Sequence, residues 1–328
     1  ASAGRFEIFN KQFFSDLSAF EILWSITCDG LVLDGGVAKV STVGARKKGA
    51  FTVKSAHLAK AEDKGERFVT FTIHTKASTA WSSTMAEVGW SQIALTSRAK
   101  AKAAVQPSDE FDGVINEYAE IQLPFGLVAP VLSLWRAPTD NDRIGHISTR
   151  WERWGLRNLT REECTVTESA NKVTIKCTWK TSTGFAIKHT QVITPNENGF
   201  TVSESVVLPK ELNDVARVGT NFELSGGLTD VTWFGNGPHE SYPDRKIGRI
   251  HRWNSTIENQ YIPYVRPQEN GGHNGVRWFE VSDPTGAGIR IDLAKPYQVS
   301  VTPNRAVDLA DATHDVEVQP CGNVVVHI

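Results

Sequence analysis

Residues 172–179 read Lys-Val-Thr-Ile-Lys-Cys-Thr-Trp, and this stretch decides the fold class. Its apolar side chains, Val173, Ile175, Cys177 and Trp179, occupy every second position, with Lys or Thr between them. A period of two places successive side chains on opposite faces of a strand, whereas a helix repeats about every 3.6 residues. The stretch therefore predicts a β-strand with one buried face and one exposed face.

The same alternation recurs along the chain, so we predict an all-β protein. Further strand-like faces are Ile22, Trp24, Ile26 and Cys28; Val69, Phe71 and Ile73; Ile289, Ile291 and Leu293; Val299 and Val301; and Val324, Val326 and Ile328. Residues 194–199 have the composition of a hairpin connection. A single short helix is expected around residues 149–157, where Trp151 and Trp154 have helical spacing.

The length of 328 residues indicates two domains, because it is large for one packed core. The alternation breaks near residues 99–107, and we place the domains at 1–104 and 105–328. A first domain of about 100 residues with short strands fits an immunoglobulin-like sandwich. The second domain is larger than an ordinary sandwich.

The composition excludes several classes of partner. A net charge of −2 without a basic cluster argues against nucleic acid or an anionic membrane, and no apolar run approaches the roughly 20 residues that span a bilayer. The four cysteines, Cys28, Cys164, Cys177 and Cys321, lack a C-x-x-C spacing. We therefore expect no metal site and four reduced core thiols, which favour a cytoplasmic location.

Three polar segments depart from the alternating pattern. Residues 135–142 read WRAPTDND, residues 233–245 read WFGNGPHESYPDR, and residues 261–275 read YIPYVRPQENGGHNG. Pro138 fixes its own φ, and the Asp and Asn residues that follow it favour turns. The first segment is therefore predicted to be a rigid polar loop that leaves a buried strand.

These segments resemble, in the same order and at similar spacing, motifs in the C-terminal part of the β-galactosidases of glycoside hydrolase family two. The resemblance implies an immunoglobulin-like sandwich followed by a β-supersandwich related to galactose mutarotase. It also implies that the catalytic glutamates, and the divalent and monovalent cations of the family, belong to a TIM barrel that precedes both domains. We therefore expect no catalytic residue, metal or cofactor in this chain.

The family continues beyond the strand that ends at Ile328, and the chain starts at Ala1 rather than Met. We therefore expect a fragment of a longer enzyme, truncated at the end of its second domain and inactive alone. The intact enzyme would hydrolyse terminal β-D-galactosides such as lactose with retention. In it, this region would contact its own catalytic barrel and offer surface for a possible homo-oligomer.

In the enzymes that this chain resembles, the segment after the first motif is mobile and borders the active site. Carried over, that segment lies within residues 139–150, with Gly145 as the candidate hinge. The substrate-proximal candidates are Asp140, Asn141, Asp142, Gly145, His146 and Ser148.

Ten tryptophans raise the possibility of carbohydrate binding, because the C–H faces of sugars pack on aromatic rings. We expect Trp24, Trp179 and Trp233 in cores, and Trp135, Trp151 and Trp154 near a cleft. The possible sugar-binding residues are Trp151, Trp154, His239, Glu240, Glu269 and His273.

The acidic candidates have competing interpretations. For Glu240, Asp244 and Glu269 we favour a structural role, in which a carboxylate binds loop amides or a nearby arginine such as Arg245. An alternative function is a free-standing carbohydrate-binding or aldose-mutarotase-like protein, with His239 and His273 as an acid–base pair. A purely structural pair of sandwiches would bind no sugar.

Overall fold

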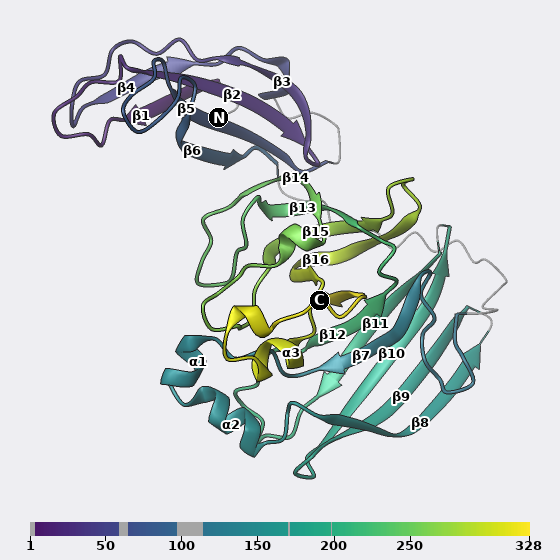
Figure 1. Ribbon diagram of the computed structural model, residues 1–328. Coiled ribbons are helices and arrows are strands. Elements are labelled where there is room, and N and C mark those ends of the chain that lie inside the picture. Colours follow the sequence, from purple (N-terminus) through teal and green to yellow (C-terminus); the bar gives the residue numbers. More distant parts are fainter. Residues whose placement is uncertain (1–3, 59–64, 97–113, 170, 198) are drawn as a thin grey trace. The chain divides into compact units, whose positions relative to one another are not determined.

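The computed structural model describes residues 4–58, 65–96, 114–169, 171–197 and 199–328, and these are mostly β-strands (Figure 1). The predicted all-β class is confirmed. The chain forms two compact units, Ala1–Ala101 with Arg249–Arg252, and Lys102–Gly248 with Trp253–Ile328. The predicted domain boundary, between residues 104 and 105, lies outside the described residues.

The described part of the first unit contains two sheets. Its strands are β1 (Arg5–Phe9), β2 (Phe20–Cys28), β3 (Leu31–Val37), β4 (Lys48–Thr52), β5 (Arg67–Thr75) and β6 (Glu87–Ala94), with a 3₁₀ turn at Ala56–Leu58. One sheet has the order β3-β2-β5-β6, and the other pairs β1 with β4. The rings of Phe6 and Phe51, from the small sheet, pack on Phe71 of the large sheet at centroid distances of 4.8 and 5.4 Å. The two sheets therefore enclose one core as a sandwich.

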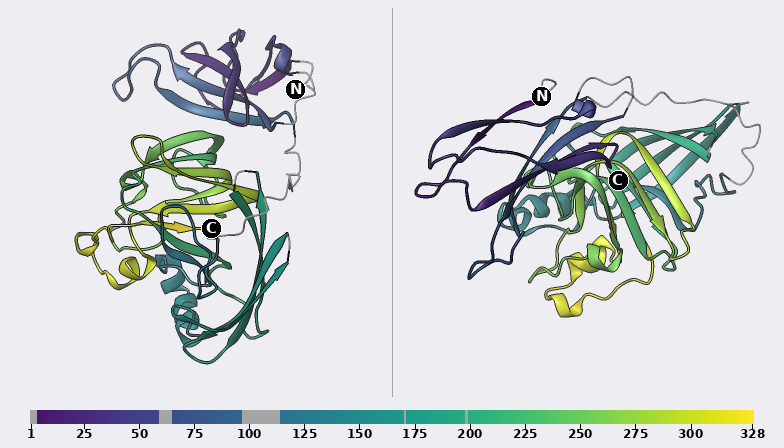
Figure 2. Two further views of the ribbon diagram at one scale, coloured as in Figure 1. Left: turned by 90° about the vertical axis from the view of Figure 1, so that its right-hand side faces the viewer. Right: turned by 90° about the horizontal axis from the view of Figure 1, so that it is seen from above.

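The second unit is built on a seven-stranded and a four-stranded sheet. The strands of these sheets are β7 (Gly126–Ser133), β8 (Leu159–Ser169), β9 (Lys172–Thr181), β10 (Ala186–Asn196), β11 (Gly199–Val207), β12 (Gly219–Leu224), β13 (Asp230–Gly237), β14 (Arg249–Thr256), β15 (Gly272–Ser282), β16 (Gly288–Thr302) and β17 (Val324–His327). The first four residues of β14, Arg249–Arg252, are grouped with the first unit. The large sheet has the order β14-β13-β15-β16-β17-β12-β7, and the small one β11-β10-β9-β8. In Figure 2 the teal strands of this small sheet lie side by side as one layer.

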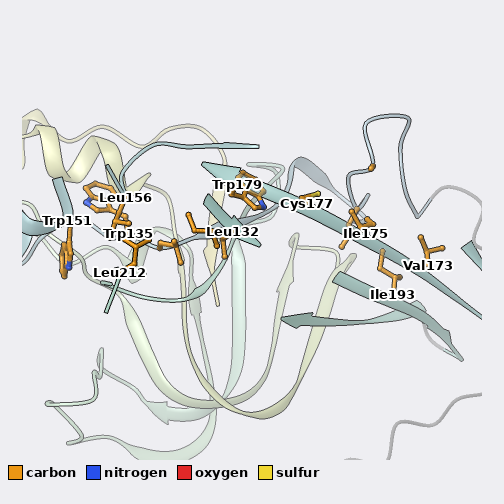
Figure 3. Packing of buried hydrophobic residues seen from close by; sticks show 14 residues of the cluster. Leu132, Trp135, Trp151, Leu156, Val173, Ile175, Cys177, Trp179, Ile193 and Leu212 are labelled. Atoms are coloured by element: carbon orange, nitrogen blue, oxygen red, sulfur yellow. The ribbon is translucent and has the colours of Figure 1, made fainter. Parts of the chain in front are cut away.

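The predicted strand faces supply the cores of this unit. Val173, Ile175, Cys177 and Trp179 of β9 are all buried in one hydrophobic cluster with side chains of β10 and of the segment after β7 (Figure 3). A second cluster lies on the seven-stranded sheet and includes Val299, Val301, Val324 and Val326. These three predicted faces, 173–179, 299–301 and 324–328, are confirmed. Full burial of each such side chain stabilises the fold by roughly 1.5–3 kcal/mol.

The hairpin prediction for residues 194–199 is also confirmed. Asn196 at the end of β10 pairs with Gly199 at the start of β11, and the two strands are antiparallel. The turn fixes the register between the two strands, and the register decides which side chains of β10 and β11 share the face that is packed on the core.

The helix prediction is correct in place but incomplete. Helix α2 spans Ile147–Arg153 and not the expected residues 149–157. It ends early because Gly155 has a φ of +65°, which is not a helical conformation. The amides of Gly155 and Leu156 bond to the carbonyls of Glu152 and Trp151, which closes the helix end. The described residues also form α1 (Asp140–Ile144) and α3 (Ala306–Asp311), with 3₁₀ turns at Glu258–Gln260 and Asp315–Glu317.

The expectation of a polar loop after Pro138 is therefore wrong in part. Thr139 caps α1, and the side chain of Asp142 binds the cap backbone in return, which is a capping box. The pattern T-x-x-D that forms this box is residues 139–142 of the first motif.

The expectation of four free thiols is also wrong. Cys164 of β8 lies opposite Cys177 of β9 in register, with a Cα–Cα distance of 4.2 Å, and the two form a disulfide. Cys28 and Cys321 are free. Alternation shows which face a cysteine occupies but not which residue lies opposite. The basis for a cytoplasmic location is lost with this correction. Among the described residues, no helix has both the length and the apolar content to cross a membrane.

Candidate ligand-binding pocket

The three polar motifs come together in the second unit around one cavity of about 520 Å³. Each motif supplies part of its lining. The first contributes Arg136, Thr139, Asn141 and Asp142, the second Tyr242, Pro243, Asp244 and Arg245, and the third Tyr264, Gln268 and Glu269. The rest comes from Ala216, Arg217 and Val218 before β12, Tyr297, Gln298 and Ser300 of β16, and His327 and Ile328. Segments more than 100 residues apart in sequence thus form one site.

The first motif is held by the buried carboxylate of Asp142. Arg136 binds both of its oxygens, at 2.8 and 3.0 Å. The backbone amide and the hydroxyl of Thr139 donate to the same carboxylate at 2.7 and 2.8 Å. The Arg136 guanidinium also lies 5.4 Å from the ring of Trp151. Asp142 is therefore a fully engaged structural group at the start of α1.

The third motif fixes α1 from the other side. The amide of Asp140 donates to Oε1 of Gln268 at 2.9 Å, and Arg143 donates to the carbonyl of Pro267 at 3.2 Å. The amide of Glu269 in turn donates to the carbonyl of Ala137 at 3.3 Å. These bonds join the first and third motifs into one wall of the pocket.

Glu240, in the second motif, is a buried carboxylate beside the cavity that is bonded by four different residues. It is only 5% exposed and accepts from Arg245 at 2.7 Å, from the amide of Gly271 at 3.1 Å, and from the hydroxyls of Tyr242, at 3.4 Å, and Tyr264. The structure confirms the predicted contact with Arg245. Four donors satisfy this buried charge, so its hydrogen bonds stabilise the loop rather than leaving an oxygen for chemistry.

The two tyrosines beside Glu240 remain protonated over the ordinary pH range. Burial and the hydrogen bond to Glu240 raise the pKa of Tyr264 to about 12. Burial, together with the charges of Glu269 and Glu240, raises the pKa of Tyr242 well above its usual value. The hydroxyl of Tyr242 also accepts from the amide of Gly272 at 3.2 Å. Both phenols therefore act as neutral hydrogen-bonding groups.

Glu269 forms a buried ion pair with Arg217. Their side chains are 6% and 16% exposed. Arg217 also lies near His327, which is buried and whose Nδ1 has no hydrogen-bond partner among the described residues. Burial and the charge of Arg217 hold the pKa of His327 well below its usual range, so the imidazole is neutral at pH 7.

The two candidate histidines are not brought together in the pocket. His239 is exposed, whereas His273 is buried and stacked on Trp233 with the ring centroids 4.1 Å apart. Burial lowers the pKa of His273 to about 4, and its Nε2 lies 2.6 Å from Oε1 of Gln260. Neither histidine lines the cavity in the described part of the chain.

The tryptophans placed near a cleft are instead core residues. Trp135 and Trp151 are 6% and 3% exposed and belong to the cluster around β9, and Trp154 packs against it. The indole of Trp151 donates to the carbonyl of Asp214 at 2.9 Å. The expectation that these rings line a cleft is therefore wrong for Trp135 and Trp151, because both are packed in the hydrophobic core. Trp179 and Trp233 are buried as predicted, and Trp24 is half-buried.

The substrate-proximal candidates divide between the pocket and the surface. Asn141 and Asp142 line the cavity, whereas Asp140, Gly145 and His146 are exposed on α1 and the turn after it. Ser148 is half-buried, and its hydroxyl donates to the carbonyl of Asp142 at 3.4 Å. The candidate hinge has an ordinary φ of −77°, and His146 takes the left-handed conformation, with φ of +55°. The special backbone conformation predicted for Gly145 therefore lies one residue later.

Sequence reasoning missed several lining residues. Tyr242 and Tyr264 are inside the quoted motifs, so their positions carried a signal. Arg217, Tyr297 and His327 are on separate strands or connections, and nothing local in the sequence links them to the motifs.

The fold and the pocket define an all-β sandwich protein with a polar cavity of the size of a small-ligand site. Residues 109–328 match the family described as "Beta galactosidase small chain", and residues 6–96 match "Beta-galactosidase, domain 4". The chain therefore belongs to the β-galactosidase family and corresponds to its C-terminal region.

Individual relatives agree with this assignment. The chain is 24% identical to a β-galactosidase of Priestia megaterium in an alignment that covers 99% of this chain and 34% of that protein. It is 30% identical to β-galactosidase BgaC of Bifidobacterium adolescentis over 59% of this chain and 19% of that protein. The chain thus spans about a third of the first relative and a fifth of the second. An alignment with a solved structure from Listeria monocytogenes covers 98% of this chain and 28% of that chain at 12% identity. Its TM-score of 0.18 is too low to indicate a shared fold.

Proposed function

We propose that this chain is the non-catalytic C-terminal region of an enzyme that hydrolyses terminal β-D-galactosides with retention. The observation that supports this proposal is that Glu240 and Glu269 are each bonded to other groups of the chain. A retaining glycosidase needs one carboxylate free to attack the sugar and a second that exchanges a proton. Of the three candidate carboxylates, Glu240 is held by four donors and Glu269 by Arg217. The exposed Asp244 is thus left without a second free carboxylate among the three. Catalysis is therefore assigned to a TIM barrel elsewhere in the enzyme, with lactose as a representative substrate.

Within that enzyme, the work of this chain is structural and steric. The third motif ties α1 to the body of the second unit through Gln268 and Pro267. This anchoring leaves the tip of the segment outside, with Ile144 77% exposed. We assign the residues around this tip to the border of the galactoside site, and the exposed surface to contacts with the barrel and between subunits.

The aldose-mutarotase alternative has less support. Ring opening requires proton transfer at two oxygens of the sugar, and thus two groups that reach one substrate. His239 is exposed, and His273 is buried against Trp233 with a pKa of about 4. Neither lies at the cavity that the described residues form.

Two assays on the purified 328-residue chain test the proposal. Hydrolysis of o-nitrophenyl β-D-galactoside is followed by absorbance, and mutarotation of α-D-galactose is followed by polarimetry. The expected result is the buffer rate in both. Enzyme-like hydrolysis that Glu240→Gln or Glu269→Gln abolishes would overturn the non-catalytic assignment. Accelerated mutarotation that His239→Ala or His273→Gln abolishes would establish the alternative.

A further inference from the structure

The pocket lined by the three motifs has no chemical role in hydrolysis under the proposed function, yet it has the features of a binding site. We propose that it binds one neutral hexopyranose, such as galactose or glucose. The site would be a sugar-binding site of this chain itself, independent of where the glycosidic bond is broken.

The size and rigidity of the pocket suit a small ligand. Its volume of about 520 Å³ falls within the range of about 300–1,000 Å³ typical of small-molecule sites. Its walls are fixed before any ligand binds, because Gln268 accepts from the Asp140 amide and Tyr242 accepts from the Gly272 amide. A preformed wall reduces the ordering cost of binding.

The charges of the lining favour a neutral ligand over an anion. Three arginines and three carboxylates line the cavity, so their formal charges sum to zero; they are Arg136, Arg217, Arg245, Asp142, Asp244 and Glu269. Each arginine already faces a carboxylate; the partner of Arg245 is Glu240, which is not among the described lining residues and adds one further negative charge beside them. His327 adds no charge, because burial keeps its imidazole neutral. An anion would have to compete with these carboxylates, whereas a polyol can bond to both members of a pair.

The uncharged part of the lining suits a sugar ring. Tyr242, Tyr264 and Tyr297 contribute three aromatic rings, and the side chain of Tyr297 is 39% exposed and therefore open to contact. Sugar C–H faces pack on such rings. The hydroxyls of Tyr242 and Tyr264 are directed to Glu240, so these rings are held in place.

Polar groups remain for the sugar hydroxyls. Asp244 and Arg245 are adjacent and exposed at the cavity, and together they offer an acceptor and donors for two neighbouring hydroxyls. Gln298 adds an amide, and buried His327 has an Nδ1 without a partner among the described residues. Unmet hydrogen-bonding capacity of this kind is uncommon inside folded proteins, and a bound hydroxyl or water would satisfy it.

The test is a titration of the full 328-residue chain at pH 7 with D-galactose and with D-glucose, followed by ligand-observed NMR, with inorganic phosphate as the anionic comparison. We expect saturable hexose binding with a Kd on the order of 1 mM, as for a few hydrogen bonds and one stacked ring. Phosphate should neither bind at this site nor displace the hexose.

Two variants place the binding in the pocket. Tyr297→Ala and Asp244→Asn should each weaken hexose binding by about fivefold, the effect of one lost ring contact or one charged hydrogen bond. The matched control is Tyr118→Ala, because Tyr118 is 68% exposed and is not among the described residues that line the cavity. It should leave the Kd within about twofold.

The absence of saturation by either hexose up to about 100 mM, displacement by phosphate, or an equal effect of Tyr118→Ala would overturn the proposal. These outcomes leave the proposed function intact, because that function is judged by hydrolysis and mutarotation rather than by binding. Conversely, hydrolysis by the chain alone would overturn the proposed function without deciding whether this pocket holds a hexose.

Discussion

Replacing Arg217 with Met is the sharpest test of the ion pair that anchors the third motif. The change keeps an apolar side chain of similar length but leaves Glu269, whose side chain is 6% exposed, as a buried charge without its partner. Loss of one member of a buried pair costs about 3–5 kcal/mol. Because Arg217 itself is 16% exposed, we expect the lower end, about 3 kcal/mol. With a urea m-value of about 2 kcal/mol/M, the midpoint should fall by about 1.5 M.

The assay is urea unfolding of the second unit, followed by tryptophan fluorescence, with two companion variants. Arg217→Met combined with Glu269→Gln should recover at least about 1 kcal/mol, because no unpaired charge remains. Lys180→Met breaks an ion pair of 2.9 Å whose side chains are 45% and 36% exposed, and it should cost less than about 1 kcal/mol. A loss below about 0.5 kcal/mol for Arg217→Met, or no recovery in the double variant, would refute the reasoning.

Three further predictions follow from the second unit. Reduction of the Cys164–Cys177 disulfide, which spans 13 residues, should lower the free energy of unfolding by about 2–3 kcal/mol, and Cys164→Ser should no longer respond to dithiothreitol. Burial lowers the pKa of His273 to about 4, so a falling pH protonates the imidazole of the unfolded state first. The stability that depends on the neutral imidazole is therefore complete above about pH 6.5 and is lost as the pH falls toward 4. Urea midpoints measured between pH 7 and 4 should therefore decline more steeply for the native chain than for His273→Gln. Gly155→Ala should lower the melting temperature, at a cost of at least about 1 kcal/mol, because Gly155 has a φ of +65° and an added Cβ would meet Ser182. Gly184→Ala is strained by its own φ of +94° but has open space around the Cβ, so it should cost less.

Local patterns predicted the strands well because they depend on near neighbours. The alternation of Val173, Ile175, Cys177 and Trp179 placed all four on one buried face. Residues 194–199 likewise formed a hairpin because a two-residue connection needs only turn chemistry between two alternating runs. The capping box of Thr139 and Asp142 was equally local, and reading T-x-x-D as a cap would have predicted α1.

Features that depend on register could not be predicted in this way. Cys164 meets Cys177 only because β8 and β9 pair with an irregularity between Arg161 and Cys164. Trp151 was placed near a cleft, but the direction of its ring depends on which face of α2 meets the sheet. The pocket joins residues 136 and 327, and no single-sequence pattern brings those two together.

The most direct test of the account is the kcat of an enzyme that contains both this chain and a catalytic barrel, with Glu240 replaced by Gln. Glu240 is held by Arg245, two tyrosines and the Gly271 amide, so its replacement should weaken the fold. We predict that the folded variant keeps kcat within about tenfold of the parent enzyme. A fall of more than about a thousandfold in kcat, with the fold preserved by circular dichroism, is the effect of losing an acid–base or nucleophilic carboxylate and would contradict the account.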